Sequence, residues 1–324
     1  AIQGFLQFQP ESRICGVILN GCTAMSYGAL AAELERQYPV KACGYLPRLP
    51  DCALESRHLG LVTAQEVSDL KEKMQRLART AEQTLDFDAL FAIAKSAPPL
   101  SFAPPELPKP GTPVRVGVAR DKAFCFFYED SLALLRKLGA ELVDFSPLEA
   151  ETLPENLQGL YLPGGYPELY AEALSQNKSM RESVRKAVIG GLPCIAECGG
   201  FMYLTEAIGD FPMAGALKGG CFDTGKLTRF GYVTLTAQID NLLCRAGEQI
   251  PAHEFHHWDA ETPGEDFRAE KPSGRSWLCA HASKTLYAGF PHFHFYANPS
   301  FAVRFLDACR KESCHAGTNK AHGD

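Results

Sequence analysis

The chain has 324 residues, of which 46% are hydrophobic and 22% are charged, and its formal net charge is −6. This composition is typical of a soluble globular protein, and the length favours two domains. The negative charge and the lack of a basic run argue against a nucleic-acid partner. The sequence contains no stretch of about 18 or more apolar residues, the length needed to span a membrane.

The 12 cysteines are scattered and form no CxxC pair, which argues against a zinc ribbon or a thioredoxin-type site. A chain of this length does not need disulfides, and its N-terminus lacks the charged and apolar segments of a signal peptide. We therefore expect reduced thiols and a cytoplasmic protein. No Met opens the sequence and a strand pattern begins almost at once, so we expect an upstream part to be missing.

The first 97 residues alternate between strand and helix patterns, with strands at 13–21 and 40–50 and helices at 27–38, 63–85 and 86–97. Thr63 and Glu66 have the spacing of a capping box, and Asp86 is a candidate cap for the helix that follows it. The alternation predicts an α/β unit with parallel strands, too short for a complete doubly wound domain. Residues 98–113 are Pro-rich and aperiodic, which predicts an extended linker between domains.

Residues 114–310 repeat the alternation and form the second predicted domain, with 311–324 as a flexible tail. Strands are predicted at 114–119, at 140–147, from 157 into a Gly-rich turn and at 193–197, and helices at 128–139, across 168–190 and from Gly199. From about 220 the pattern becomes β-rich. We predict an α/β domain with a mostly parallel sheet flanked by helices on both faces.

Functional residues of such folds follow the carboxyl ends of the strands, where two turns stand out. One is PGGYPE at 163–168, and the other is ECGG at 197–200, where a strand stops and a helix begins directly. Such a sharp turn with small neighbours can present Cys198 as a nucleophile, and the helix N-terminus favours the thiolate. The local pattern alone leaves open that Cys198 is a small buried core residue.

A cysteine nucleophile needs a base, and two C-terminal stretches hold five histidines: His253, His256, His257, His292 and His294. The alternate positions of His292 and His294 would also suit a metal, but no clustered cysteines or acidic partners accompany them, so we predict no metal site. Gly164 and Gly165 offer backbone N–H groups that could form an oxyanion hole or cradle a phosphate. The chain contains no P-loop pattern.

Five stretches, in this order, resemble a known family: LYLPGGYPELYAEAL, CIAECGGFMYL, FGYVTLT, HEFHHW and HFHFYANP. Together they are similar to the cobyrinic acid a,c-diamide synthases and, more widely, to the class I glutamine amidotransferases. CGVILNG, LPRLP and ESRHLGLVTAQE in the first domain also resemble that family, so the likeness covers nearly the whole chain. It implies a class I glutamine amidotransferase-like domain, preceded in residues 1–97 by the C-terminal portion of a dethiobiotin-synthetase-like α/β domain.

The resemblance implies that Cys198 attacks the side-chain amide of glutamine and forms a thioester, with His292 as general base and acid. The residues expected to form the oxyanion hole or to border the glutamine are Gly164, Gly165, Gly199, Tyr166 and Glu168. Many class I members carry a Glu two residues after the catalytic His, but His294 holds that position here, which leaves the group that orients His292 unassigned. His294 and His256 are secondary candidates, and we expect a structural or substrate-adjacent role for His256.

The resemblance also implies ATP and Mg²⁺ for the complete enzyme. We expect no tightly bound cofactor in this chain, because the family's phosphate site would precede residue 1. Asn20 and Pro47 match the pocket for the nucleotide base, although an ordinary Asn-Gly turn would explain Asn20 equally well.

These inferences predict the glutamine-hydrolysing portion of an ATP-dependent ligase that amidates the a and c carboxylates of cobyrinate, a corrin, in cobalamin biosynthesis. By itself the chain is expected to be at most a glutaminase. Two alternatives stay open: an amidase of another tetrapyrrole (hydrogenobyrinate, nickel-sirohydrochlorin or a cobyric acid type), and a catalytically silent domain of the same fold. The sequence leaves the oligomeric state, a homodimer included, and the ammonia route undecided.

Overall fold

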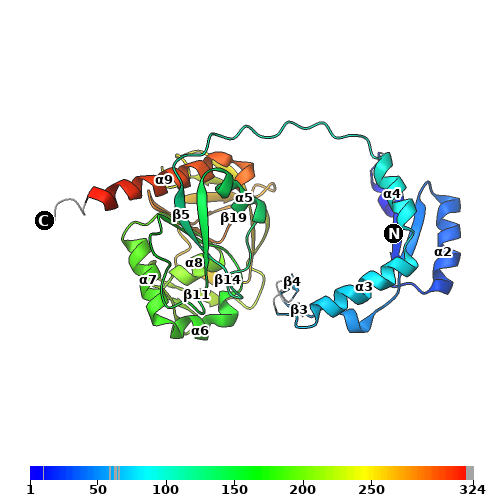
Figure 1. Cartoon of the computed structure of the whole chain (residues 1–324), viewed down its shortest axis with the longest axis horizontal. Coiled ribbons are helices and arrows are strands. Elements are labelled where there is room, and N and C mark those ends of the chain that lie inside the picture. The colour runs from blue at the N-terminus through cyan, green and yellow to red at the C-terminus, as the bar shows by residue number, and fades with distance from the viewer. Residues whose placement is uncertain (10, 58–59, 62–63, 65, 319–324) are drawn as a thin grey trace. The chain divides into compact units, whose positions relative to one another are not determined.

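The computed structural model describes residues 1–9, 11–57, 60–61, 64 and 66–318. The chain divides into two compact units, Ala1–Pro105 and Glu106–Asp324 (Figure 1). The division falls within the Pro-rich segment at 98–113, where residues 98–110 form neither helix nor strand. Among the described residues, no helix is both long and apolar enough to cross a membrane.

The first unit alternates helices and strands: α1 (Ile2–Phe8), β1 (Gly16–Asn20), α2 (Ala24–Gln37), β2 (Lys41–Leu46), η1 (Pro50–Cys52), β3 (Ser56–Arg57), β4 (Gly60–Leu61), α3 (Leu70–Thr84) and α4 (Phe87–Ser96). β1 and β2 pair in parallel, as the alternation predicts, and α2, α3 and α4 all contact β2. The predicted cap of α4 is confirmed, because the Asp86 carboxylate accepts a hydrogen bond from the Ala89 N–H at 2.9 Å.

Two features of this unit differ from the prediction. Helix α3 begins at Leu70 rather than at residue 63, and residues 56–57 and 60–61 pair as a short antiparallel hairpin ahead of it. Its first turn is instead tied by an ion pair of 2.8 Å between Lys73 and Asp69, and Thr63 of the predicted capping box lies outside the described residues. Helix α1 was not predicted, since it has neither a capping side chain nor a buried residue.

The second unit is built on a six-stranded sheet of order β17-β18-β8-β7-β5-β6. Its strands are β5 (Val114–Ala119), β6 (Ala140–Phe145), β7 (Gly159–Leu162), β8 (Cys194–Glu197), β17 (His281–Ala282) and β18 (Leu286–Gly289). All neighbours pair in parallel except β17 and β18. This order confirms the predicted mostly parallel sheet.

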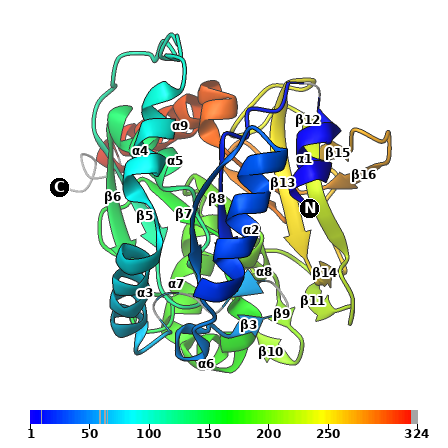
Figure 2. The same ribbon diagram turned by 90° about the vertical axis from the view of Figure 1, so that its right-hand side faces the viewer.

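Two further sheets are built from strands that follow β8 in sequence. One has the order β10-β9-β11-β14 and is built from β9 (Ala207–Ile208), β10 (Phe211–Pro212), β11 (Gly220–Asp223) and β14 (Trp258–Ala260). The other has the order β16-β15-β12-β13-β19 and is antiparallel throughout, with β12 (Arg229–Ala237), β13 (Gln249–His256), β15 (Phe267–Glu270), β16 (Ser276–Cys279) and β19 (His292–Phe293). Figure 2 shows β12 and β13 side by side as its two long strands.

Helices cover both faces of the six-stranded sheet. Successive residues of a strand point to opposite sides, and here the apolar side chains on each side are buried in a separate cluster. On β7 and β8, Tyr161 and Ile195 enter one buried cluster, whereas Leu160 and Cys194 enter the other. The helices of this unit are α5 (Glu129–Lys137), η2 (Pro167–Tyr170), α6 (Ala171–Gln176), α7 (Lys178–Ile189), α8 (Gly199–Leu204), η3 (Phe295–Ala297) and α9 (Pro299–Thr318). The first cluster contains α5, α9 and the antiparallel sheet, and the second contains α6, α7 and α8.

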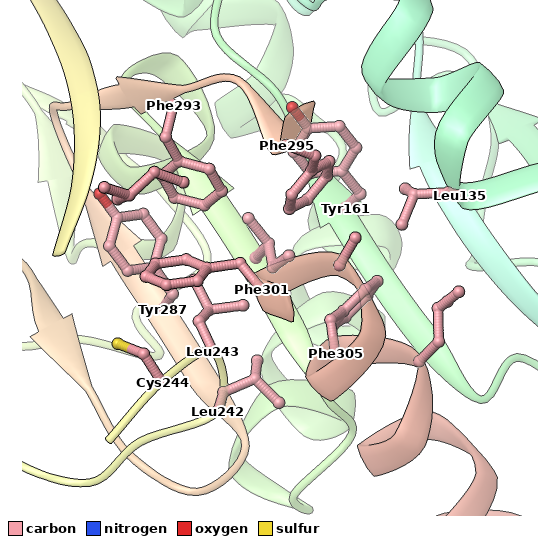
Figure 3. Packing of buried hydrophobic residues seen from close by; sticks show 14 of the residues in the cluster. Leu135, Tyr161, Leu242, Leu243, Cys244, Tyr287, Phe293, Phe295, Phe301 and Phe305 are labelled. Carbon is pink, nitrogen blue, oxygen red and sulfur yellow. The ribbon is translucent and has the colours of Figure 1, made fainter. Parts of the chain in front are cut away.

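Helix α9 extends the first cluster beyond the sheet. Phe301 and Phe305 are fully buried one helical turn apart, and Figure 3 shows them in one cluster with Tyr161, Phe295, Tyr287 and Leu135 of α5. The backbone of α9 is helical as far as Thr318, past the start of the segment suggested as a tail. Residues 319–324 of that segment lie outside the described residues.

We predict that Phe301→Ala lowers the free energy of unfolding of the second unit by about 3–5 kcal/mol, because it opens a cavity at a fully buried site. Both tryptophans, Trp258 and Trp277, lie in this unit, so their fluorescence during denaturant unfolding reports on it alone. Ile189→Ala, at a side chain that is 59% exposed, is the control and should change the value by about 0.5 kcal/mol or less. Equal losses in the two variants would contradict the packing described.

Candidate active site

Cys198 lies on the strand-to-helix turn between β8 and α8. Its backbone has φ 47° and ψ −102°, a left-handed conformation that residues with side chains rarely adopt. The turn is held by a hydrogen bond of 2.7 Å from the Cys198 N–H to the Gly289 carbonyl at the end of β18. It also requires glycine at 200, where a Cβ would lie 2.0 Å from the Leu162 carbonyl oxygen. The geometry is that of a nucleophile elbow.

His292 reaches this turn from the antiparallel sheet. It begins β19, pairs with His253 of β13, and is only 5% exposed. Gly164 lies between the two side chains: a Cβ built there would be 2.5 Å from His292 Cε1 and 3.5 Å from Cys198 Cβ. The sulfur and the imidazole therefore meet at Gly164, where only a glycine leaves room.

Hydrogen bonds stabilise the charged form of His292. Burial by itself opposes that charge, but hydrogen bonds to Cys198 and to Glu197 raise the pKa of His292 to about 10. The Glu197 contact joins Oε2 to His292 Nδ1 at 3.2 Å. An imidazolium beside a thiol favours the thiolate, the nucleophilic form of cysteine.

Two backbone amides lie together beside the elbow. A Cβ built on Gly199 would be 3.1 Å from the Gly165 nitrogen, and neither of these N–H groups has a hydrogen-bond acceptor among the residues that the structure describes. The Gly164 N–H, in contrast, donates to the Phe126 carbonyl at 3.1 Å. Gly165 and Gly199 can thus donate to a developing oxyanion, whereas Gly164 contributes space.

Tyr166 and Glu168 lie on the turn that follows Gly165. The Tyr166 N–H donates to the Ala123 carbonyl at 2.9 Å, and Glu168 lies in the first turn of η2. Both side chains are half-buried, and their contact with glutamine stays a prediction.

His294 does not orient His292. Its Nε2 lies 3.0 Å from Asp130 Oδ2 on α5, and its side chain is 32% exposed. The residue that does contact His292 Nδ1 is Glu197, directly before the nucleophile, to which the sequence assigned no role. In the sequence, the one hint of a role for Glu197 was the presence of an acidic residue directly before Cys198.

His256 is buried in the core rather than aimed at the elbow. Its Nδ1 lies 2.6 Å from the Trp258 carbonyl oxygen, and its ring stacks on Phe290 with centroids 4.0 Å apart. Burial lowers the pKa of His256 to about 4, and burial likewise raises the pKa of its neighbour Glu254 to about 7. Both groups are therefore neutral near pH 6 in the folded state.

Asn20 and Pro47 line one pocket of about 570 Å³ in the first unit, together with Gly21, Leu46 and Arg48. Its walls combine apolar side chains with an amide and a guanidinium. For metals, no group of three or more His, Cys, Asp or Glu side chains that could hold an ion lies within the described part of the chain. Every cysteine whose side chain is described is free.

The elbow, the histidine and the paired amides all lie within residues 115–299, which match the CobB/CobQ-like glutamine amidotransferase domain. The chain is 36% identical over 317 residues to the cobyrinate a,c-diamide synthase of Caldanaerobacter subterraneus subsp. tengcongensis, covering 95% of this chain and 70% of that protein. It is 38% identical over 308 residues to the Listeria monocytogenes serotype 4b synthase, covering 92% and 68%. It is 35% identical over 318 residues to the Priestia megaterium synthase, covering 95% and 69%. The chain belongs to the cobyrinate a,c-diamide synthase family.

We predict that Glu254→Gln introduces a pH dependence into the stability of the second unit. Between about pH 4.5 and 6.5, the folded wild type holds a protonated Glu254 and a neutral His256, whereas the unfolded chain holds the reverse, so their proton counts balance. In the variant only His256 remains, and the unfolded state binds the extra proton. The free energy of unfolding should then rise with pH, relative to wild type, by up to about 1.4 kcal/mol per unit.

Tryptophan fluorescence in denaturant at several pH values measures this difference. Glu182→Gln, at an exposed residue of α7 whose side chain is 69% exposed, is the control and should leave the slope unchanged. An unchanged slope in Glu254→Gln would contradict this account, because His256 would then be protonated in the folded variant as it is in the unfolded chain.

Proposed function

We propose that this chain hydrolyses glutamine at Cys198 and supplies the ammonia to an ATP-dependent ligase that amidates the a and c side-chain carboxylates of cobyrinate. The observation that carries the proposal is the meeting of Cys198 and His292 at Gly164, on a strained elbow beside two amides that have no acceptor among the described residues. Membership of the family supports the assignment of a glutamine-dependent amido-ligase activity. The names of the relatives favour cobyrinate over the alternative tetrapyrroles as the acceptor.

The first step is attack of the Cys198 thiolate on the side-chain amide carbon of glutamine. A carbon–sulfur bond forms, and the carbonyl electrons move onto the oxygen. The N–H groups of Gly165 and Gly199 donate to that oxyanion, and because the backbone fixes them beforehand, they need no reorganisation during the reaction.

His292 completes the cycle by moving protons through Nε2, since Nδ1 is held by Glu197. The imidazolium protonates the leaving nitrogen, the carbon–nitrogen bond breaks, and ammonia departs from a glutamyl thioester. Neutral His292 then takes a proton from water as the water oxygen bonds to the thioester carbon. The carbon–sulfur bond breaks, and glutamate leaves as the sulfur returns to the thiolate. The proton on Nε2 and the regenerated thiolate restore the starting state.

In the first unit, we propose that the Asn20 pocket holds the base of ATP. Its apolar walls suit the face of a purine, and the Asn20 amide and the Arg48 guanidinium suit its polar edge. Bound ATP would supply the activation of the acceptor carboxylate. We assign no residue to Mg²⁺, because the described residues offer no cluster that fits it. A cytoplasmic setting agrees with the free thiols.

We predict that Cys198→Ala abolishes glutamine hydrolysis, because it removes the sulfur atom that forms the thioester. Release of ammonia and of glutamate measures the reaction. Cys194→Ala is the matched control: the residue lies on the same strand but is fully buried, and burial raises the pKa of its thiol, so it stays neutral. The control should retain hydrolysis, and unchanged hydrolysis in Cys198→Ala would refute the mechanism.

A further inference from the structure

Glu197 places a carboxylate behind the catalytic histidine. It ends β8, one residue before the nucleophile, and its side chain is 1% exposed. Oε2 lies 3.2 Å from His292 Nδ1 and accepts a second hydrogen bond from the Tyr161 hydroxyl at 3.3 Å. Burial, and next the charge of Glu197, raise the pKa of Tyr161 well above its usual range, so that hydroxyl keeps its proton and donates.

Stabilisation of the fold alone does not explain the buried carboxylate of Glu197. Its other oxygen, Oε1, is buried and has no hydrogen-bond partner among the described residues. A buried charge with an unsatisfied oxygen usually costs more than it contributes to folding, unless a cation compensates it. Among the described residues, the cation that contacts it is the imidazolium of His292, which links the carboxylate to the reaction rather than to packing.

The other candidate for this role points elsewhere. His294, two residues after His292, pairs with Asp130 at the start of α5. The His294 imidazole therefore contacts α5 rather than His292. The acceptor for His292 Nδ1 is Glu197.

We propose that Glu197 is the positioning residue of the site: its carboxylate holds the proton on Nδ1 of His292 and so turns Nε2 toward Cys198. This inference rests on the proposed glutamine hydrolysis. A carboxylate at this position fixes the tautomer of the ring and stabilises the imidazolium that donates to the leaving ammonia. The orienting residue Glu197 and the nucleophile Cys198 are therefore adjacent in sequence, and a displacement of one residue displaces the other.

The pH dependence of hydrolysis is the signature of this role, because the carboxylate stabilises the imidazolium. Without its charge, His292 loses its proton at lower pH, and the alkaline limb of the rate profile moves down. Among the described residues, the other titratable groups that interact with His292 or Glu197 are Cys198, Tyr128, Tyr161, Tyr287, His253 and His256. None of these is altered in the variant below.

The test is the isosteric variant Glu197→Gln in the full chain, with kcat and KM for glutamine measured across pH. We expect kcat to fall by about 10²-fold or more, KM to stay within about twofold, and the alkaline limb to shift by about one unit or more to lower pH. Glu197→Asp keeps the charge and should keep the alkaline limb near its wild-type position at a reduced kcat. Glu182→Gln is the control for an exposed carboxylate and should match wild type.

Two outcomes would overturn the positioning role while leaving the proposed function intact. One is a Glu197→Gln variant with wild-type kcat and pH profile. The other is a loss of kcat with an unmoved alkaline limb and a lowered melting temperature, which marks a purely structural residue. A wild-type chain that releases no more ammonia than Cys198→Ala would overturn the proposed function itself, and the positioning role with it.

Discussion

The parallel pairing of β8 with β18 is the constraint on which the site depends. Glu197 lies opposite Gly289, and the Cys198 N–H donates to the Gly289 carbonyl at 2.7 Å. His292 follows Gly289 by three residues, so this register brings Cys198 and His292, the proposed nucleophile and base, to the same end of the sheet. A slip of one residue would turn the side chains of β8 to the opposite face and separate the pair.

The rest of the second unit keeps that register fixed. Alternate residues of β7 and β8 enter two separate buried clusters, so both faces of the strands are packed. The antiparallel sheet holds His292 from the other side through the pairing of β13 with β19. The strain at Cys198, a non-glycine residue at positive φ, persists because these contacts over-determine the turn.

The sequence predicts the backbone of the site better than its side-chain pairs. The elbow could be read from the short strand and the two glycines, since local sterics dictate that turn. His292 could not be chosen among five histidines from the residues alone, and only the family resemblance singled it out. Glu197 was missed because its contact with His292 joins β8 to β19, far apart in the sequence, and α3 begins at Leu70, later than its helical pattern indicates.

The most direct test of the account is to identify the residue that glutamine chemistry modifies. The chain is treated with the diazoketone glutamine analogue 6-diazo-5-oxo-norleucine, with and without excess glutamine, and mapped by peptide mass spectrometry. The account predicts one adduct, on Cys198 and on no other of the 12 cysteines, suppressed by glutamine. An adduct on another cysteine, or labelling of Cys198 that glutamine does not suppress, would contradict it.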